Sequence, residues 1–207
     1  MDYLSLTNEC LAHGFDDSLW RSRFKTWINE AQKIVVRRSN IPEFESTDGF
    51  FSTAGDESLG FLASDFLTVI SMRDVTNSQG EYPLELVTIL DVDQALQLSG
   101  RPDFYRLVSN EVFVWPIPDA VYTYTMRYRS NCANLVNDND SPEIPADYHL
   151  MLVDWALYRA FMGGADDENR YGFFLAQFND QLNQMRRDLE VRSEDRNLQV
   201  TGTMDWS

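Results

Sequence analysis

Side chains that commonly carry catalysis or bind metals are few in this chain. Its two histidines are His13, beside the helix-ending Gly14, and His149, in the first turn of an apolar helix expected over 146–162. Both positions favour a structural histidine over a catalytic or metal-binding one. No GxSxG, Walker, GxGxxG or HExxH motif occurs. The sequence therefore predicts no catalytic residue and no enzyme.

The carboxylate clusters have simpler explanations than acid catalysis or metal binding. Asn137–Asp140 resembles the start of a calcium loop, but a Ser-Pro pair follows where an EF-hand loop requires glycine. Asp91 and Asp93 suit a turn or a helix cap. The acids at 166–168 precede a predicted helix, whose dipole favours them there. We expect no metal site and no cofactor.

Three tyrosines alternate with polar residues near the centre of the chain. Tyr122, Tyr124 and Tyr128 lie in 121–130, with the period of a half-buried strand. An exposed row of tyrosines would suit a sugar-binding platform, whereas a sheet face packed against a helical bundle gives the same pattern. We favour the packed face.

The charge balance argues against a nucleic-acid-binding protein. The 207 residues include 33 acidic and 17 basic ones, which gives a net charge of -16. Binding to phosphates requires the opposite balance. An acidic surface would instead let DNA slide past without specific binding.

Neither a membrane segment nor a disulfide framework is indicated. The most apolar stretch, Leu150–Met162, is interrupted by charges. Met1–Cys10 has no basic, cleavable signal. Cys10 and Cys132 lie far apart without a CxxC partner, so two reduced thiols are expected. We expect a soluble protein made in the cytoplasm.

Helices are expected at both ends of the chain, and they would position His13 and His149. A short helix is expected over Ser5–His13 and a longer one from Asp16 to Ser39, which Pro42 ends. Near the C-terminus, an apolar helix over Ala146–Met162 precedes a long helix that ends near Arg192. The apolar face of the N-terminal long helix comprises Trp20, Phe24, Trp27, Ile28, Ala31, Ile34 and Val35.

Strand patterns replace the helical period in the middle of the chain. A turn is expected at 77–80 and a helical turn over Asp91–Leu98. Strands are expected over Phe66–Val75, Leu84–Val92, Tyr105–Trp115 and Val121–Ser130.

The predicted fold class is α+β: a helical bundle formed by the N- and C-terminal helices, with an inserted antiparallel β-rich subdomain and an extended C-terminal tail. The expected boundaries are 1–42 for the N-terminal helices, 43–131 for the insertion, 132–192 for the C-terminal helices and 193–207 for the tail. The tail is polar but ends in an apolar anchor, a combination often found in segments that order on binding a partner.

The order of these features resembles the head-to-tail adaptor, or connector, proteins of tailed bacteriophages. The segments that carry the resemblance are Trp27–Ala31, Phe113–Pro118, Tyr124–Tyr128, Pro142–His149, Leu152–Leu157 and Phe178–Asp188. Such proteins form a ring, commonly of twelve subunits, beneath the portal, and continue the DNA channel towards the tail. The resemblance covers most of the chain, although Glu43–Asp103 is longer than a minimal adaptor requires.

The resemblance implies a structural protein of the virion neck, present in the host cytoplasm during assembly. Its partners would be the portal protein, a tail or neck protein below, and other copies of itself in a ring of twelve. Double-stranded DNA would pass through without specific binding, and no membrane is involved. The candidate portal-binding residues are Leu198, Val200, Met204 and Trp206.

Three alternatives stay open. A tail-tube or tail-terminator subunit would also be a structural virion protein, but its fold would be dominated by β-structure. A carbohydrate-binding or hydrolytic accessory protein would require exposed aromatic residues around Tyr122–Tyr128. A cellular helical regulator would form a small oligomer without affinity for a portal.

Overall fold

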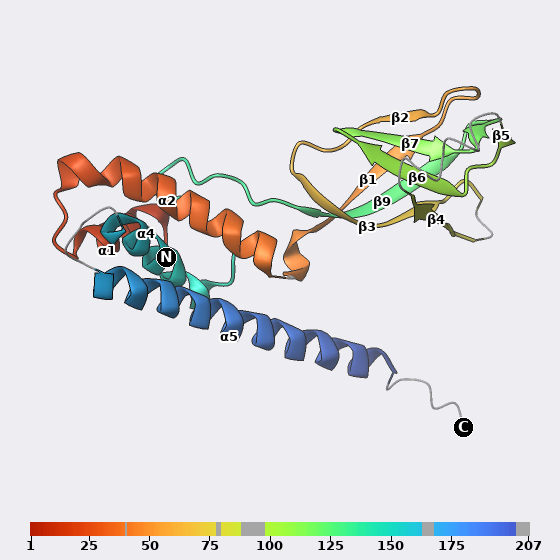
Figure 1. Cartoon of the computed structure of the whole chain (residues 1–207). Coiled ribbons are helices and arrows are strands. Elements are labelled where there is room, and N and C mark those ends of the chain that lie inside the picture. Colours follow the sequence, from red (N-terminus) through yellow and green to blue (C-terminus); the bar gives the residue numbers. More distant parts are fainter. Residues whose placement is uncertain (40, 78–79, 88–97, 163–167, 202–207) are drawn as a thin grey trace. The chain divides into compact units, whose positions relative to one another are not determined.

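The structure is a computed structural model of the whole chain (Figure 1). It describes residues 1–39, 41–77, 80–87, 98–162 and 168–201, with backbone alone at Glu43, 168–169 and 191–201. The chain forms two compact units: Met1–Pro42 joined with the chain from Cys132 onward, and Glu43–Asn131. Each unit has buried apolar residues of its own.

Helices from both ends of the chain form the first unit. They are α1 (Tyr3–Leu11), α2 (Asp17–Arg38), the short helix η2 (Ala146–Tyr148), α4 (Leu150–Phe161) and α5 (Glu168–Thr201). The Asp2 side chain accepts the Ser5 N–H at 2.8 Å, and Asp16 accepts the Ser18 N–H at 2.9 Å. Each carboxylate thus satisfies one of the free N–H groups at a helix start. The predicted long N-terminal helix is confirmed.

Helix α4 is the centre of the helical unit, since it contacts α1, α2 and α5. Most of its residues are buried, as expected for a helix that is apolar on nearly every side. Its neighbours contribute apolar residues at spacings of three and four. From α2 these are Phe24, Ile28, Ala31 and Val35, and from α5 they are Phe178, Leu182, Met185 and Leu189.

The second unit is a seven-stranded sheet with the order β1-β9-β3-β4-β6-β7-β2. Neighbouring strands are antiparallel except β4 and β6. The two end strands, β1 and β2, also contact each other, so the sheet curls into a nearly closed barrel. The bounds are β1 Glu45–Phe51, β2 Ser58–Phe61, β3 Phe66–Asp74, β4 Tyr82–Leu86, β6 Phe104–Val108, β7 Glu111–Trp115 and β9 Thr123–Ser130. A separate pair joins β5 (Ser99–Gly100) and β8 (Ile117–Pro118), and η1 (Pro42–Phe44) precedes β1.

The inner face of this sheet holds its own apolar core. The cluster comprises Phe50, Leu62, Met72, Leu84, Tyr105, Val112, Val114, Tyr124 and Met126. Along β9 the burial alternates as the sequence predicts, with Tyr124, Met126 and Tyr128 buried. The expectation that this face packs against the helical bundle is wrong, because Tyr124 and Met126 lie in the core of the β unit.

The predicted fold class is therefore wrong. The β region is not a small insertion supported by a bundle but a nearly closed barrel-like sheet with its own core. One cause is the expected single strand Tyr105–Trp115, which is a hairpin of β6 and β7. Ser109, at the turn, has a φ of 58°, a conformation that non-glycine residues seldom adopt. A Ser-Asn turn lacks the glycine by which such hairpins are usually recognised.

Two further expectations need correction. The predicted strand Leu84–Val92 is β4, Tyr82–Leu86, and the helical turn expected over Asp91–Leu98 lies almost entirely outside the described residues. The C-terminal tail predicted as extended from Ser193 is helical as far as Thr201, because α5 continues to that residue. The apolar stripe ends at Leu189, but no proline or glycine follows before Gly202. Apolar periodicity reports burial, whereas a helix also continues through polar residues of good propensity.

The buried carboxyl group of Asp154 yields a test of the helical core. Asp154 is 7% exposed, lies in apolar α4 and accepts a hydrogen bond from Gln181 Nε2 of α5 at 2.7 Å. Burial raises its pKa to about 6. Since the unfolded-state pKa lies near 3.8, the folded state binds the proton more tightly. The contribution of Asp154 to stability should therefore become more favourable as the pH falls from 7 towards 4.

We expect Asp154→Asn to raise the free energy of unfolding at pH 7.5, by up to about 3 kcal/mol. The asparagine Oδ1 can still accept a hydrogen bond from Gln181, and the substitution removes the buried charge. The gain should shrink as the pH falls to 5, measured by urea denaturation at both values. Asp180→Asn, on an exposed site of α5, is the control and should change stability by less than about 0.5 kcal/mol. Equal destabilisation by Asp154→Asn at both pH values would contradict the assignment.

Candidate assembly surfaces

The first half of α5 is fixed to the helical unit, and its last described buried side chain is Leu189. Besides its apolar contacts, α5 accepts a hydrogen bond at Asp188 from the Tyr148 hydroxyl and donates one from Gln181 to Asp154. At 1.5 Å per residue, its 34 residues span about 50 Å. Figure 1 shows its C-terminal end leading away from the helices on which its first half packs. The end of α5 is thus a candidate surface for a partner.

The predicted portal-binding residues fall partly on this helix end. Leu198 and Val200 lie in the last turns of α5, where the backbone is helical, while Met204 and Trp206 lie outside the described residues. In an extended tail, Leu198 and Val200 would point to the same side. In a helix, residues two apart do not share a face. The backbone at Leu198 and Val200 is therefore helical where the sequence predicted an extended tail.

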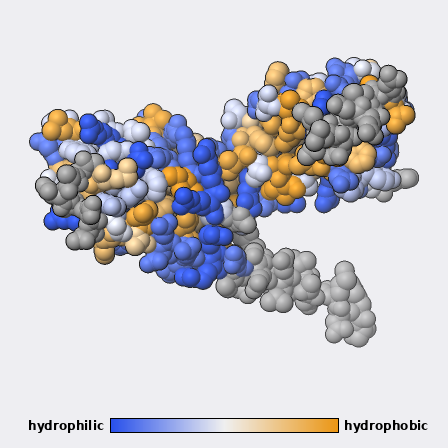
Figure 2. All heavy atoms as spheres, viewed as in Figure 1, coloured by the Kyte–Doolittle hydropathy of each residue, from blue (hydrophilic) through white to orange (hydrophobic). Residues whose placement is uncertain are grey.

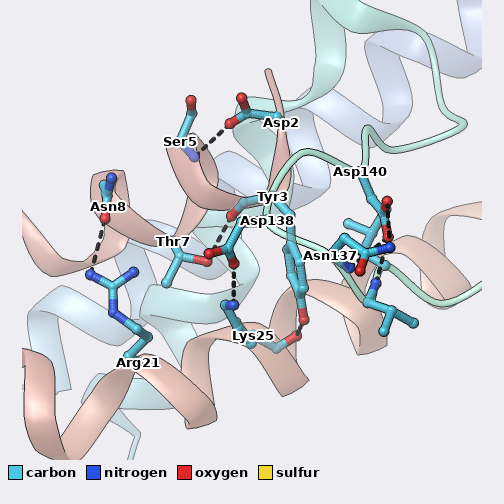
Figure 3. A network of polar contacts seen from close by, with 12 residues as sticks. Asp2, Tyr3, Ser5, Thr7, Asn8, Arg21, Lys25, Asn137, Asp138 and Asp140 are labelled. Atoms are coloured by element: carbon cyan, nitrogen blue, oxygen red, sulfur yellow. Dashed lines mark hydrogen bonds and ion pairs between the residues drawn. The ribbon is translucent and has the colours of Figure 1, made fainter.

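A polar network fastens the segment 135–140 to α1 and α2 (Figure 3). Asn29 of α2 is its main clamp: its Nδ2 donates to the Leu135 carbonyl at 3.0 Å and to the Tyr3 hydroxyl oxygen at 2.9 Å. Its Oδ1 accepts the Leu135 N–H at 2.8 Å. The Tyr3 hydroxyl in turn donates to the Lys25 carbonyl at 2.7 Å. One side chain thereby joins three segments that are far apart in the sequence.

The acids of the suspected calcium loop belong to the same network. Asp140 Oδ2 accepts the N–H groups of Val136 and Asn137, each at 2.8 Å, and these hydrogen bonds lower the pKa of Asp140. Asp138 pairs with Lys25. Both carboxylates therefore have structural partners. Within the part of the chain that the structure describes, no group of three or more potential ligands could hold a metal ion.

The histidines and cysteines have structural surroundings. His149 is buried, and its Nε2 lies 3.0 Å from the Ile144 carbonyl oxygen. The His13 ring meets Phe174 edge-on. Neither cysteine forms a disulfide, both are buried, and burial raises the pKa of the Cys10 thiol to about 12. A thiol with so high a pKa is a poor nucleophile at neutral pH.

The tyrosines of β9 offer no sugar-binding platform. Tyr124 is fully buried and Tyr128 is 5% exposed. Burial raises the pKa of Tyr124. A carbohydrate-binding face at these tyrosines would require exposed rings.

A shallow hollow of about 640 Å³ runs between α2 and the segment after Cys132. It is lined by Thr26, Asn29, Glu30, Lys33, Asn134, Leu135 and Val136. Its lining combines polar side chains with the apolar Leu135 and Val136, and it contains no histidine or cysteine. None of the described helices is long and apolar enough to cross a membrane.

The outside of the β unit carries apolar side chains that the sequence patterns did not single out. Figure 2 shows hydrophobic surface over this unit beside hydrophilic residues. Phe51 is 66% exposed, Phe61 is 74% exposed and Phe104 is 39% exposed. A strand pattern indicates which residues alternate, but the identity of the outer face depends on how the sheet curls. Exposed aromatics on a structured unit favour interaction with another protein.

Comparisons with known proteins gave one family. The family model described as SU10 adaptor protein matches residues 1–203. A comparison with curated proteins found no match.

The Asn29 clamp can be tested by removing its amide. Asn29→Ala leaves the Leu135 N–H and carbonyl without their side-chain partner, so we expect a loss of about 2 to 4 kcal/mol in unfolding free energy. Lys25→Ala removes a partly exposed ion pair with Asp138 and a contact of the ammonium with the Tyr3 ring, and it should cost about 1 kcal/mol. Asn139→Ala, at an exposed asparagine of the same loop, serves as the control. Equal effects of Asn29→Ala and Asn139→Ala in chemical denaturation would argue against the clamp.

Proposed function

The chain belongs to the SU10 adaptor protein family, a family of phage head-to-tail adaptors, and on that basis we propose that it forms a ring beneath the portal of a tailed phage. Membership makes it a structural protein of a phage particle that interacts with portal and tail proteins. The proposed ring has twelve copies and continues the DNA channel from the portal towards the tail. The observation that carries the proposal is the family match over nearly the entire chain.

The end of α5 is the proposed contact with the portal. Its first half is fixed by buried apolar residues and by Tyr148 and Gln181, so the helix direction is set before a partner binds. A preformed helix loses less conformational entropy on binding than an extended tail would. We propose that a groove of the portal takes the helix end with Leu198 and Val200, which Met204 and Trp206 follow in the sequence.

The charge of the protein supports a channel that DNA traverses without sticking. Its net charge is -16, and phosphates are repelled by acidic walls. The β unit is the proposed contact with the tail or neck protein below, since it has its own core and exposed aromatic residues.

The alternatives are less well supported. The helical unit, with α4 buried among three other helices, does not suit a tail-tube or terminator subunit dominated by β-structure. The buried Tyr124 and Tyr128 remove the feature on which a carbohydrate-binding protein depended. Nothing in the family match favours a cellular helical regulator.

Cryo-electron microscopy of the particle neck tests the location directly. A closed ring of this chain between portal and tail, with residues after Leu189 ordered against the portal, is the expected result. A location elsewhere in the particle, or an open arrangement, would overturn the proposed ring.

Substitutions at the helix end test the portal contact. We expect Leu198→Asp and Val200→Asp each to weaken binding to purified portal particles at least about tenfold, because a carboxylate enters an apolar contact. Gln199→Asp adds the same charge between them and is the matched control, with an expected change below about threefold. Surface plasmon resonance measures the affinities, and circular dichroism verifies the helix content. Equal losses for all three variants would indicate simple charge repulsion instead of a specific contact.

A further inference from the structure

The outer face of the β6–β7 hairpin carries an arginine that lies on aromatic rings. Along β6, Tyr105 belongs to the inner core and Leu107 packs against it, so Phe104 and Arg106 face outward. Along β7, Val112 and Val114 face inward, so Phe113 and Trp115 lie on the same side of the sheet as Arg106, where Trp115 is 1% exposed. Arg106 Cζ lies 5.2 Å from the Phe113 ring centroid and 4.7 Å from that of Trp115. We name Phe104, Arg106, Phe113 and Trp115 the arginine platform.

Arg106 differs from three other arginines of the β unit. Arg73, Arg101 and Arg127 form ion pairs with Glu81, Asp74 and Glu45. For Arg106 the described residues provide ring contacts but no carboxylate, and its buried Nε has no hydrogen-bond partner. The Trp115 Nε1 on the same face is also buried without a partner. A guanidinium that meets no carboxylate among the described residues is a notable exception in a chain with 33 acids.

Stacking on the two rings orients the Arg106 guanidinium so that it can bind a carboxylate. A planar guanidinium that lies flat on rings is held in one orientation and can present its edge to both oxygens of a carboxylate. Phe104, 39% exposed, lies opposite Trp115 on the neighbouring strand, and Phe61 of β2, 74% exposed, is in register with Glu111 of β7. An arginine that lies on a buried tryptophan and is bordered by exposed phenylalanines has the composition of the energetic centre of a protein interface.

The end strands of the sheet favour binding of a partner to the outer face of the sheet, and they disfavour pairing of a partner strand with the sheet edge. On β1, the Gly49 N–H donates to Asp48 Oδ1 at 2.9 Å. On β2, the Ser58 N–H donates to Asp56 Oδ1 at 3.0 Å, and the Gly60 N–H donates to the Ser58 hydroxyl at 3.3 Å. Local side chains thus occupy backbone donors on both end strands. Such protection is a known way to prevent edge-to-edge pairing.

We propose that the arginine platform docks an acidic segment of a second copy of this chain. Charge complementarity is the basis for this occupant: each copy carries a net charge of -16, so a neighbouring copy offers carboxylates to Arg106. A phosphate backbone fits poorly, because binding one takes several basic side chains, whereas the arginine platform contains one arginine. The inference rests on the proposed ring and specifies one of its contacts. In a ring each copy uses two different surfaces, so an arginine platform on one side requires an acidic surface on the other.

The test compares two outward arginines of the β unit. Arg106→Glu and Arg106→Gln, made in the full-length chain, should weaken association between copies at least about tenfold, as the loss of a central interface arginine does. Arg106→Lys keeps the charge but loses the planar stacking, so it should restore part of the association. Arg127→Gln, at an exposed arginine paired with Glu45, is the matched control and should change the association less than about threefold.

Native mass spectrometry would count copies for the chain alone and for the chain mixed with portal particles, and circular dichroism would verify folding. Rings formed by the wild type and by Arg127→Gln but not by folded Arg106→Gln support the platform. Rings that form equally well with Arg106→Gln and Arg106→Glu overturn it and leave the adaptor function intact. Failure of the wild type to form rings under either condition overturns the proposed ring and, with it, this contact.

Discussion

The burial of α4 is the constraint on which the rest of the structure depends. Its apolar surface is too extensive to be covered by one neighbour, and helices from both ends of the chain surround it. The chain ends must therefore meet in one unit, and everything between Glu43 and Asn131 becomes an insertion. The chain must leave the helical unit and return to it at nearby points, so the two ends of the insertion must lie close together. Adjacent strands β1 and β9 satisfy that requirement, since Glu45 pairs with Arg129 at the start of one and the end of the other.

The two units solve the problem of burial differently. The helical unit buries apolar faces between helices and tightens the remaining chain with the Asn29 clamp. The β unit curls its sheet until the inner side chains cover one another and the end strands, β1 and β2, come into contact. Since each unit has its own core, the surface residues of one unit can change without unfolding the other unit. Such independence suits an adaptor that must contact different proteins on its two sides.

Acidic residues are abundant, but many of those described have local structural duties. Asp2 and Asp16 cap helices, and Asp140 accepts two backbone N–H groups. Asp74 is fully buried, and its hydrogen bonds from Thr76 and Arg101 lower its pKa. Against this background the charge of the protein has two consequences for assembly. It disfavours adhesion to DNA, and it makes any unpaired arginine a natural contact for another copy.

Local patterns in the sequence were enough to predict the helices and the alternating burial of β9, and they contained no recognisable catalytic motif. Asp16 and Pro42 bound α2, and Tyr124, Met126 and Tyr128 are buried as their spacing predicts. The order of segments was also sufficient to identify the adaptor family, which the match over residues 1–203 confirms.

Other features depended on contacts between distant residues, which no local pattern records. The Ser109 turn, the pairing of β1 with β9 and the closure of the sheet decide that β9 faces a core of its own. The helical course of Ser193–Thr201 was missed because apolar periodicity ends where burial ends, not where the helix does. The arginine platform arises only because the β6–β7 hairpin brings Arg106 beside Phe113 and Trp115. The sequence determines which residues can form such contacts, and the tertiary structure decides which of them meet.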